Sequence, residues 1–378
     1  MRIVYCLNSI SHIGGIEAIT LFKASALAQI ETNTVWVLYT EQADADPFSP
    51  SNNVRFVDLK VRYYDNAWPF PLNILHLGFR SIAHKKRMRR VLKHIQPDIV
   101  VSTGKLEYRF LPSIKGPWKT IREMHSTKHF RIMNAQTPAQ RLIAKLGEWI
   151  DYGFIIRRYD QVVLLTQEDR ETYWQEEDDR ICVIPNPCRF QTDAFSPLTA
   201  HRILSVGRLA FEKNFSSLIR AFSLVHSRFP DWRLDIIGDG SDRASLLSEI
   251  EKLHLSDVVH LCGSSCHIQE EMLDSSIFVS TSRHEGFSLV ILEAISCGLP
   301  VVTYSFPCGP KDILQDGING FLVPPEDESA LAEQISRLIQ DESLRKQIGV
   351  AAKQRSKDFE IEHICELWMA LFERLGAS

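Results

Sequence analysis

Two positively charged side chains follow a short apolar run in the second half of the chain. The run Arg202–Val206 is followed at once by Gly207 and Arg208, and Lys213 comes later in the same loop. In open α/β sheets, ligands bind beyond the carboxyl ends of the strands. Two cations at such an end suit a diphosphate, although an Arg and a Lys in a loop are more often plain surface charges.

A second candidate site lies where a glycine-containing turn precedes a helix. The turn Glu285–Ser288 leads into a helix expected at Leu289–Cys297, and Glu293 lies inside that helix. Free backbone N–H groups and the positive end of the macrodipole at a helix start can bind an anion. Carboxylates can also hold the hydroxyl groups of a ligand, but near a helix start they often serve only as caps.

A third candidate is the turn Gly238-Asp239-Gly240, which follows the strand expected at Arg233–Ile237. Glycines here would let the backbone come close to a ligand or to neighbouring loops. A tight turn with no ligand explains the same residues equally well, so both interpretations stay open.

Short apolar runs alternate with longer amphipathic stretches, a pattern typical of parallel sheets covered by helices. With 378 residues, the chain is long enough for two domains. Strands are expected at Arg2–Leu7, Thr34–Tyr39, Asp98–Ser102, Gln161–Thr166 and Arg180–Ile184, and then at Arg202–Val206, Arg233–Ile237, Val258–Leu261, Ile277–Ser280 and Pro300–Thr303. The segment 185–197, rich in turn formers, predicts the connection between the two sets.

The expected domains follow from this division. The first covers residues 1–188, the second covers 189–356, and a terminal helix lies within 357–378. Trp368, Leu371 and Phe372 fall on the apolar side of that last helix. The fold class is therefore α/β with two Rossmann-like domains.

Composition excludes several classes of protein. The 44% of hydrophobic residues is typical of a soluble globular chain, and the formal net charge of −4 argues against a nucleic-acid binder. We expect no secretory leader, because the apolar run that ends at Leu7 is short and polar residues follow it, and we see no apolar stretch of roughly 18 residues that could span a bilayer. We therefore expect a cytoplasmic protein.

The eight cysteines indicate no metal site. They contain no C-x-x-C pair, and the one close group, Cys262 and Cys266 beside His267, has poor spacing for zinc. Asp44 and Asp46 form the only Asp-x-Asp, in a polar loop of the first half. Reduced thiols and no metal requirement are expected.

One segment is conspicuous by its charge. It holds the cations Lys85, Lys86, Arg87, Arg89 and Arg90. Such a run is most often a solvated helix face, but it also suits a surface that meets anionic lipid headgroups. The nearby apolar stretch Trp68–Leu72 would add to a peripheral contact with the inner face of the cytoplasmic membrane.

Taken in order, the motifs of the second half resemble the donor domain of the GT-B fold in the retaining family 4 glycosyltransferases. The matching segments are 206–209 with Lys213-Asn214, 237–240, 282–293, 297–302, Gly309-Pro310 and 316–323. The family's pair of glutamates separated by seven residues is present as Glu285 and Glu293. The resemblance covers roughly residues 180 to 330.

The resemblance implies a role for each of these residues. Arg208 and Lys213 would bind the donor diphosphate, Glu285 the transferred sugar, and Glu293 the ribose hydroxyls. The turn residues that would lie near the distal phosphate and sugar are Gly286, Phe287, Ser288 and Leu289. Gly238 would lie at the donor site, and the backbone around Gly263 would hold the base.

The first half resembles the family more loosely. Gly14 and Gly15 match its N-terminal glycine loop near the donor phosphate, although an ordinary turn explains them too. His125 lies where the family commonly has a histidine over the sugar, although a lone histidine is more often structural. The resemblance further implies a cleft between the two domains and a C-terminal helix that crosses back to the first.

The implied reaction is same-face transfer, in which the departing phosphate accepts the proton of the acceptor. The expected donor is a nucleoside-diphosphate sugar, most often a UDP-sugar, and the expected acceptor is a glycan or lipid-linked glycan in polysaccharide biosynthesis. No cofactor is expected. A nucleotide-sugar epimerase of the same fold and a non-catalytic nucleotide-sugar-binding protein are the alternatives. An NAD enzyme is disfavoured because no G-x-G-x-x-G follows the first strand. A PLP-dependent phosphorylase is disfavoured because the chain is too short for that group.

Overall fold

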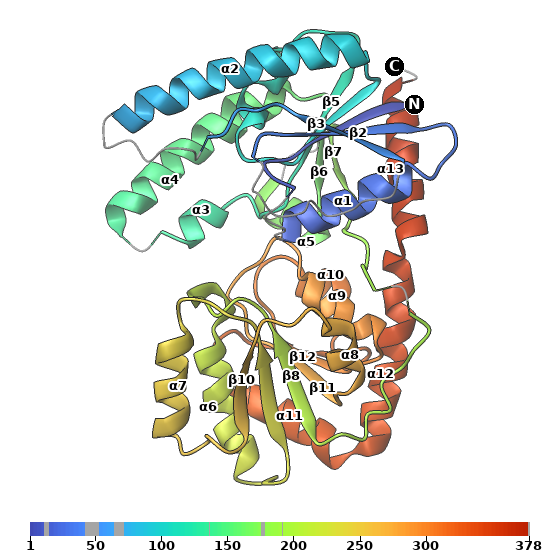
Figure 1. Cartoon of the computed structure of the whole chain (residues 1–378). Coiled ribbons are helices and arrows are strands. Elements are labelled where there is room, and N and C mark those ends of the chain that lie inside the picture. Colours follow the sequence, from blue (N-terminus) through green and yellow to red (C-terminus); the bar gives the residue numbers. More distant parts are fainter. Residues whose placement is uncertain are drawn as a thin grey trace. The chain divides into compact units, whose positions relative to one another are not determined.

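The computed structural model describes residues 1–10, 15–41, 53–63, 72–135, 137–174, 178–190 and 192–376, without the side chains of 72–77. The chain divides into two compact units, each with one parallel sheet (Figure 1). The N-terminal unit contains Met1–Leu165, Tyr173–Pro187 and Ile361–Ser378. The C-terminal unit contains Cys188–Glu360 and also the short segment Thr166–Thr172. Gly14, Asp44, Asp46 and residues 68–71 lie outside the described residues.

The N-terminal unit has a seven-stranded sheet in the order β3-β2-β1-β4-β5-β6-β7. Its strands are β1 (Arg2–Cys6), β2 (Thr34–Tyr39), β3 (Val54–Asp58), β4 (Ile99–Ser102), β5 (Lys119–Glu123), β6 (Gln161–Leu164) and β7 (Ile181–Val183). The longer helices are α1 (Gly15–Leu27), α2 (Leu72–Ile95) and α4 (Pro138–Ile150), with α3 (Phe130–Met133) before α4. The strand order reverses between β1 and β4, which makes their carboxyl ends the topological switch point of this sheet.

Alternation along the strands divides the core of this unit into two layers. Ile3 and Tyr5 belong to one hydrophobic cluster, whereas Val4 and Cys6 belong to the other. The C-terminal helix α13 (Ile361–Gly376) completes the first cluster with its buried apolar face, which includes Trp368. Figure 1 shows α13 next to α1, as their contacts require. The expected apolar side of this helix is therefore confirmed.

The C-terminal unit has a six-stranded sheet in the order β10-β9-β8-β11-β12-β13. Its strands are β8 (Arg202–Val206), β9 (Arg233–Ile237), β10 (Val259–Gly263), β11 (Ile277–Ser280), β12 (Val301–Tyr304) and β13 (Phe321–Val323). Its helices are α5 (Gln167–Asp169), α6 (Phe215–His226), α7 (Arg243–Lys252), α8 (Ile268–Leu273), α9 (Leu289–Ser296), α10 (Pro310–Ile313), α11 (Glu328–Gln340) and α12 (Glu342–Ser356). Here the order reverses between β8 and β11, the two strands that precede the predicted donor loops.

Three strands were not predicted from the sequence. In β5, the segment Lys119–Glu123 has three charged residues, and β3 likewise carries charge at Arg55 and Asp58. Only Val54 is buried in β3, and the buried residues of β5 are Thr120, Ile121 and Glu123, so neither strand forms a continuous apolar run. The third, β13, is only three residues long.

Candidate active site

The loops after β8 and β11 meet at the switch point of the C-terminal sheet. Nζ of Lys213 lies 2.9 Å from Oε1 of Glu285, and Ser282 donates a hydrogen bond of 2.6 Å to the same oxygen. Both charged side chains are largely buried. The structure thus brings together the cation and the carboxylate that the sequence placed at a donor site, and it adds Ser282, which the sequence did not single out.

Backbone contacts fix the Lys213 loop against the loop after β11. Asn214 has a left-handed backbone with φ 53°, which turns the chain from a short 3₁₀ segment into α6. The Thr281 hydroxyl lies 3.1 Å from the carbonyl oxygens of both Lys213 and Asn214. The amide of Arg283 also donates to the carbonyl of Glu212 at 2.9 Å. These contacts therefore fix the backbone of Lys213 at this edge of the sheet.

Arg208 differs from Lys213 because it extends into solvent. Its side chain is 73% exposed and pairs with the carboxylate of Glu212. Burial acts to raise the pKa of Glu212, but hydrogen bonds from its own backbone and from Arg208 outweigh it, so that pKa lies below its ordinary value. An exposed guanidinium at this edge is accessible to an incoming anion.

The glycines of the Gly238 turn serve loop packing. A Cβ on Gly238 would lie 1.8 Å from the carbonyl oxygen of Gly207, and its φ of 146° is unfavourable for other residues. A Cβ on Gly240 would come within 2.3 Å of the Leu209 carbonyl oxygen. These glycines therefore let the loops after β8 and β9 pack closely. Gly263, at the end of β10, also has a positive φ of 76°, but a Cβ there would meet open space.

The start of α9 is tightly enclosed. Phe287 and Ser288 are buried, and within the described residues the Ser288 hydroxyl has no hydrogen-bond partner. A Cβ on Gly309, whose φ is 125°, would lie 3.3 Å from the Ser288 amide nitrogen. The loop that precedes α10 therefore packs onto the turn that includes Gly286. The amide of Leu289 donates to the Phe287 carbonyl at 3.1 Å, so this amide already has a partner in the protein.

Glu293 lies on α9 with only 2% of its surface exposed. Burial raises the pKa of its carboxyl, and Arg189 offsets this only in part. Nε of Arg189 donates to Oε1 of Glu293 at 2.8 Å, and its Nη2 donates to the same oxygen. The sequence analysis missed Arg189, because nothing in the turn-rich segment 185–197 marks one arginine as the partner of a distant carboxylate.

His284 is a second residue that the sequence analysis missed. It is buried next to Glu285, and burial lowers the pKa of its imidazole although Glu212 and Glu285 act in the opposite direction. A neutral ring at this position adds no positive charge to the loop after β11. In the sequence, only its position between Arg283 and Glu285 could have indicated that His284 lies near the site.

In the N-terminal unit, His125 follows β5 and lies beside a buried ion pair. Its Nε2 is 3.4 Å from Oε1 of Glu123, which also pairs with Lys23 of α1. Burial would raise the pKa of Glu123, but Lys23 and His125 outweigh it and lower that pKa to about 2. Lys23 also lies 5.2 Å from the ring centre of Trp368 on α13. His125 is therefore held by a charged cluster that ties α1, β5 and α13 together. Gly15 is exposed at the start of α1.

A basic cavity of about 540 Å³ lies at the ends of β4 and β5 in the same unit. The cations that line it are Lys105, Arg109, Arg122, Lys128 and Arg131. Asp151 is the single acid among its described lining residues, and Arg131 pairs with it at 2.5 Å. The excess of positive charge suits a ligand that carries phosphate or carboxylate groups.

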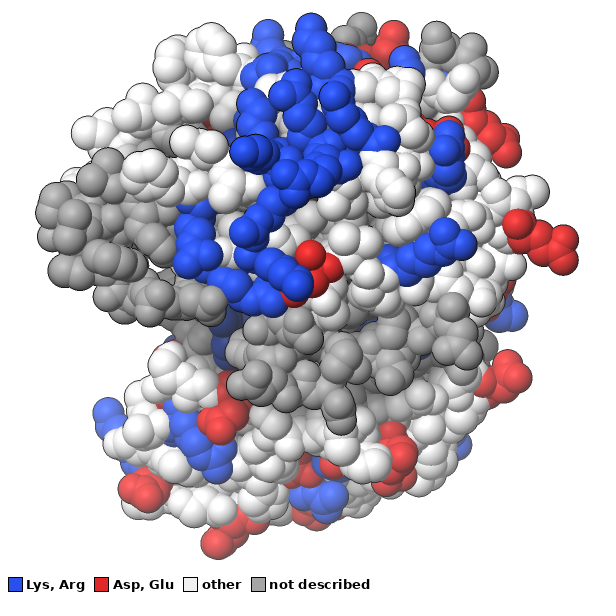
Figure 2. All heavy atoms as spheres, turned by 45° about the horizontal axis from the view of Figure 1, so that its top comes forward, with Lys and Arg blue, Asp and Glu red and all other residues white. Residues whose placement is uncertain are grey.

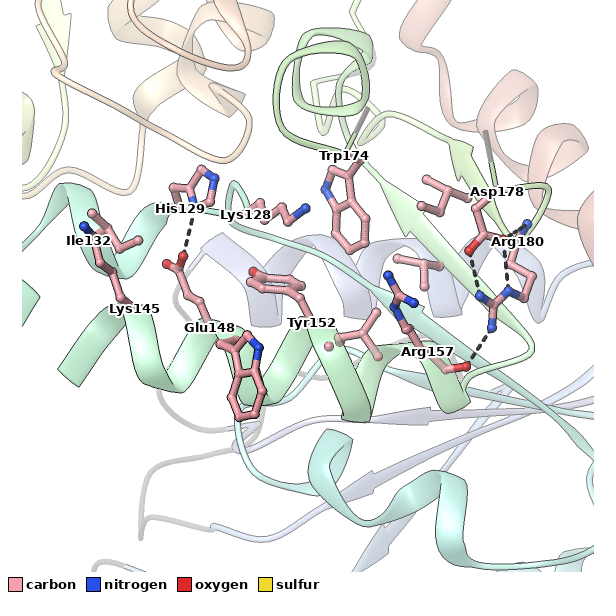
Figure 3. A pocket seen from close by; sticks show the side chains of 15 residues that line it. Lys128, His129, Ile132, Lys145, Glu148, Tyr152, Arg157, Trp174, Asp178 and Arg180 are labelled. Atoms are coloured by element: carbon pink, nitrogen blue, oxygen red, sulfur yellow. Dashed lines mark hydrogen bonds and ion pairs between the residues drawn. The ribbon is translucent and has the colours of Figure 1, made fainter. Parts of the chain in front are cut away.

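A second cavity, of about 430 Å³, shares Lys128, Tyr152 and Ile156 with the first (Figure 3). Its other aromatic side chains are those of Trp149 and Trp174, and Figure 3 shows Lys128 directed toward the Trp174 ring, whose centre is 5.0 Å from Nζ. Oε2 of Glu148 lies 2.8 Å from Nδ1 of His129. Oε1 of Glu148 and Nε1 of Trp174 are buried without a hydrogen-bond partner among the described residues. A ligand with hydroxyl groups could satisfy both.

Neither a metal cluster nor a membrane-spanning helix occurs in the described part of the chain. Within it, no three His, Cys, Asp or Glu side chains are grouped so as to hold a metal ion, and this includes Cys262, Cys266 and His267. All eight cysteines are free thiols. None of the described helices is both long and apolar enough to cross a bilayer.

Similarity to known proteins identifies the family of this chain. The profile named "Glycosyl transferases group 1" matches residues 191–355. The amylovoran biosynthesis glycosyltransferase AmsD of Erwinia amylovora is 30% identical, with 74% of this chain and 78% of that protein covered. An uncharacterized glycosyltransferase of Haemophilus influenzae is 27% identical over 98% of this chain and 99% of that protein. An exopolysaccharide phosphotransferase of Streptomyces coelicolor is 33% identical over 76% of this chain, but the match covers only 30% of that protein.

Solved structures share the fold at low identity. S. aureus TarM, crystallised with UDP, has a TM-score of 0.76 at 15% identity, with 98% of this chain and 99% of that chain covered. Anabaena HepE in complex with UDP and glucose has a TM-score of 0.75 at 18% identity, with 99% and 100% covered. The α/β GT-B fold expected from the sequence is thus confirmed. Together with the match to AmsD, the profile shows that the chain belongs to the glycosyl transferases group 1 family.

Proposed function

We propose that this glycosyltransferase is a retaining enzyme that moves a sugar from a nucleoside-diphosphate sugar, most simply a UDP-sugar, to a glycan or lipid-linked glycan in polysaccharide biosynthesis. The observation that carries the proposal is the contact between Lys213 and Glu285 at the switch point of the C-terminal sheet. A UDP donor is supported by TarM and HepE, both of which were crystallised with UDP. A role in polysaccharide assembly is supported by the name of AmsD.

Charge development at the leaving phosphate determines the proposed roles. As the sugar bond breaks, negative charge grows on the diphosphate, so that fixed cations near it lower the barrier. Lys213 and Arg208 supply these cations, and the start of α9 supplies backbone N–H groups and a helix dipole. The phosphate then accepts the acceptor's proton on the same face of the sugar, so no enzyme nucleophile is required.

The remaining residues are proposed to orient the donor. Glu285 accepts hydrogen bonds from hydroxyl groups of the transferred sugar, and Glu293 from those of the ribose. Gly14, Gly15 and His125 contribute from the N-terminal unit. The buried cluster around Glu123 fixes the His125 ring, so that its position does not depend on the ligand.

We place the acceptor in the N-terminal unit. The cavity between Trp149 and Trp174 offers aromatic faces and two unpartnered polar atoms, which suit a sugar with its hydroxyl groups. The adjoining basic cavity around Arg122 and Arg131 suits an acidic or phosphate-bearing part of the same acceptor. The TarM complex also contains a sugar-bearing glycerol, which supports a glycan acceptor.

Two further expectations complete the proposal. Transfer requires no metal ion or other cofactor. The enzyme works in the cytoplasm and contacts an anionic membrane surface through the basic run of α2, of which Lys86, Arg87, Arg89 and Arg90 are exposed. In Figure 2 the top of Figure 1 is turned forward, and Lys and Arg side chains gather on the upper part of this face.

The test begins with thermal-shift screening of the purified chain against nucleotide sugars, because a donor that binds only the folded protein raises its melting temperature. The hit is then incubated with candidate acceptors, and the anomeric configuration of the product is determined by NMR. Retention with an acceptor present supports the proposal. Conversion of the donor sugar without any acceptor would favour an epimerase, and inversion would refute the same-face mechanism.

A further inference from the structure

Helix α4 exposes its large apolar side chains. Leu142, Leu146 and Trp149 are 70%, 58% and 62% exposed, although all three lie in a regular helix. The neighbouring exposed apolar residues are Ile143, Ile150 and Phe154. The only buried residues of α4 are Ala144 and Glu148. An apolar patch of this kind on a soluble protein marks an interaction surface.

Helical geometry puts the most exposed apolar stripe of α4 and its two buried residues on opposite sides. At 3.6 residues per turn, Leu142, Leu146 and Trp149 repeat at i, i+4 and i+7 and form one stripe, whereas Ala144 and Glu148 lie on the far side. A helix that only covers a core would show the reverse arrangement, with its apolar stripe inward. The apolar face of α4 therefore points away from the unit that carries it.

The helix is held in place independently of any partner. Thr137 caps its start: the amide of Gln140 donates to the Thr137 hydroxyl at 3.2 Å, and the Gln140 side chain accepts from the Thr137 amide at 3.1 Å. On the inner side, Glu148 is fixed by His129. The exposed stripe is thus presented on an ordered element.

The charges around the stripe indicate which kind of partner it contacts. The two basic side chains of α4, Arg141 and Lys145, are exposed, and the one acid of the helix, Glu148, is buried. The basic helix α2 packs on the same hydrophobic cluster as Tyr152 and Ile155, which continue α4. Helix α2 also exposes Phe79 and Ile82 beside its cations. A second copy of the chain would bring like charges together across a symmetric contact, whereas an anionic bilayer complements them.

We infer that α4 lies in the interface of an anionic membrane leaflet, with the stripe of Leu142, Leu146 and Trp149 buried among the upper acyl chains. Apolar insertion and attraction of the cations to headgroups act together in such helices, and tryptophan favours this depth. The inference deepens the membrane contact proposed above for α2. Trp149 also lines the acceptor cavity, so insertion would bring that cavity to the membrane surface, where a lipid-linked acceptor resides.

The test is co-sedimentation with vesicles of phosphatidylcholine plus phosphatidylglycerol, compared with phosphatidylcholine alone. The wild-type chain should bind the anionic vesicles, and Leu142→Ser/Leu146→Ser should lower the affinity by roughly tenfold or more, since two large apolar side chains are lost. The matched control is Leu224→Ser/Val350→Ser, which removes apolar side chains that are 47% and 61% exposed in the C-terminal unit and should bind as wild type. Melting temperatures confirm that both variants are folded.

A second readout depends on Trp149 itself. Brominated lipids should quench the fluorescence of the wild-type protein on anionic vesicles, and Trp149→Phe should remove most of that quenching. Wild-type binding by the Leu142/Leu146 variant would overturn insertion of α4 and leave the α2 contact intact. No binding by the wild-type chain would overturn both. A wild-type dimer that the serine variant converts to a monomer would identify the stripe as an interface between copies and overturn the inference. None of these outcomes depends on transfer activity.

Discussion

Nζ of Lys213 lies 2.9 Å from Oε1 of Glu285, so that the two charges proposed to bind different parts of the donor neutralise each other. A diphosphate offers Lys213 a second anion, and a sugar hydroxyl offers Glu285 a second donor. The contact therefore keeps two largely buried charges paired in the free protein and holds them in position for the ligand. Ser282 donates to the same carboxylate oxygen and helps to fix it.

Lys213→Ala should lower turnover by about 100-fold or more, because the leaving phosphate loses a charge that stabilises it in the transition state. Single-turnover transfer by the purified variant measures the effect. Lys252→Ala is the matched control, since Lys252 is an exposed lysine at the end of α7 in the same unit. Near-normal turnover of folded Lys213→Ala would remove Lys213 from the site.

Arg208→Ala should separate catalysis from stability. Arg208 is 73% exposed and its partner Glu212 lies on the surface loop, so the lost pair should change the free energy of unfolding by no more than about 1 kcal/mol. Turnover should nevertheless fall by about 100-fold or more if the guanidinium meets the diphosphate. Kinetics and thermal unfolding on one preparation measure both. A variant with normal turnover would show that Arg208 is only a surface charge.

Sequence predicted the fold best where an apolar run lies between clear turn signals. Strands β8, β9 and β11 have the predicted bounds, because each holds three aliphatic or aromatic residues within four or five positions and is followed by a glycine or a polar residue. Strand β5 was missed because Lys119, Arg122 and Glu123 interrupt the pattern. Glu123 is nevertheless buried, since Lys23 of a distant helix neutralises it. Such tertiary compensation leaves no local signal.

The same limit applies to the candidate site. Lys213 and Glu285 could be predicted because each follows a strand, and the ends of neighbouring parallel strands meet at one edge. Arg189 could not, because its role depends on where a turn-rich segment returns to α9. The outward face of α4 was missed for a similar reason. The pattern shows that Leu142 and Leu146 share a face, but only the packing of Ala144 and Glu148 shows that this face points to solvent.

Arg189→Met should destabilise the C-terminal unit by about 3 kcal/mol near neutral pH, because it leaves the carboxylate of Glu293 buried and unpaired. Burial already raises the pKa of Glu293 in the folded protein. Below the unfolded pKa the group is protonated in both states, and the cost of its charge appears as pH rises through the folded pKa. The variant should therefore become less stable as pH rises from the unfolded pKa of Glu293 to its folded pKa. Urea unfolding across the pH range tests this, and Arg189→Met/Glu293→Gln should recover much of the loss. A double variant no more stable than the single one would contradict the account.

Metal independence is tested by transfer in excess chelator. Because Lys213, Arg208 and the start of α9 are proposed to carry the charge of the leaving group, activity should be retained after prolonged dialysis against EDTA. The control is a metal-dependent glycosyltransferase treated alongside. Abolished activity that returns with added divalent cations would show that the charge stabilisation assigned to these residues is incomplete.

His84 should make the N-terminal unit acid-sensitive. It lies within the basic run of α2 but is buried, with Nδ1 2.9 Å from the Tyr63 hydroxyl and its ring edge against Phe110. Burial lowers the pKa of its imidazole from 6.5 to about 4. Between these values the unfolded chain binds a proton that the folded chain does not, so stability falls as pH drops from about 6.5 to about 4.

His84→Phe keeps an aromatic ring at this position and removes the titration. The slope of its free energy of unfolding against pH should therefore be smaller across that window, by the equivalent of up to one bound proton. Over the whole interval this difference amounts to no more than roughly 3 kcal/mol. Denaturant unfolding at a series of pH values measures the slope, and His363→Phe, at an exposed site on α13, should leave it nearly unchanged. An unaltered slope in His84→Phe would mean that the buried ring takes up its proton at an ordinary pKa, with water or a carboxylate reaching it in solution.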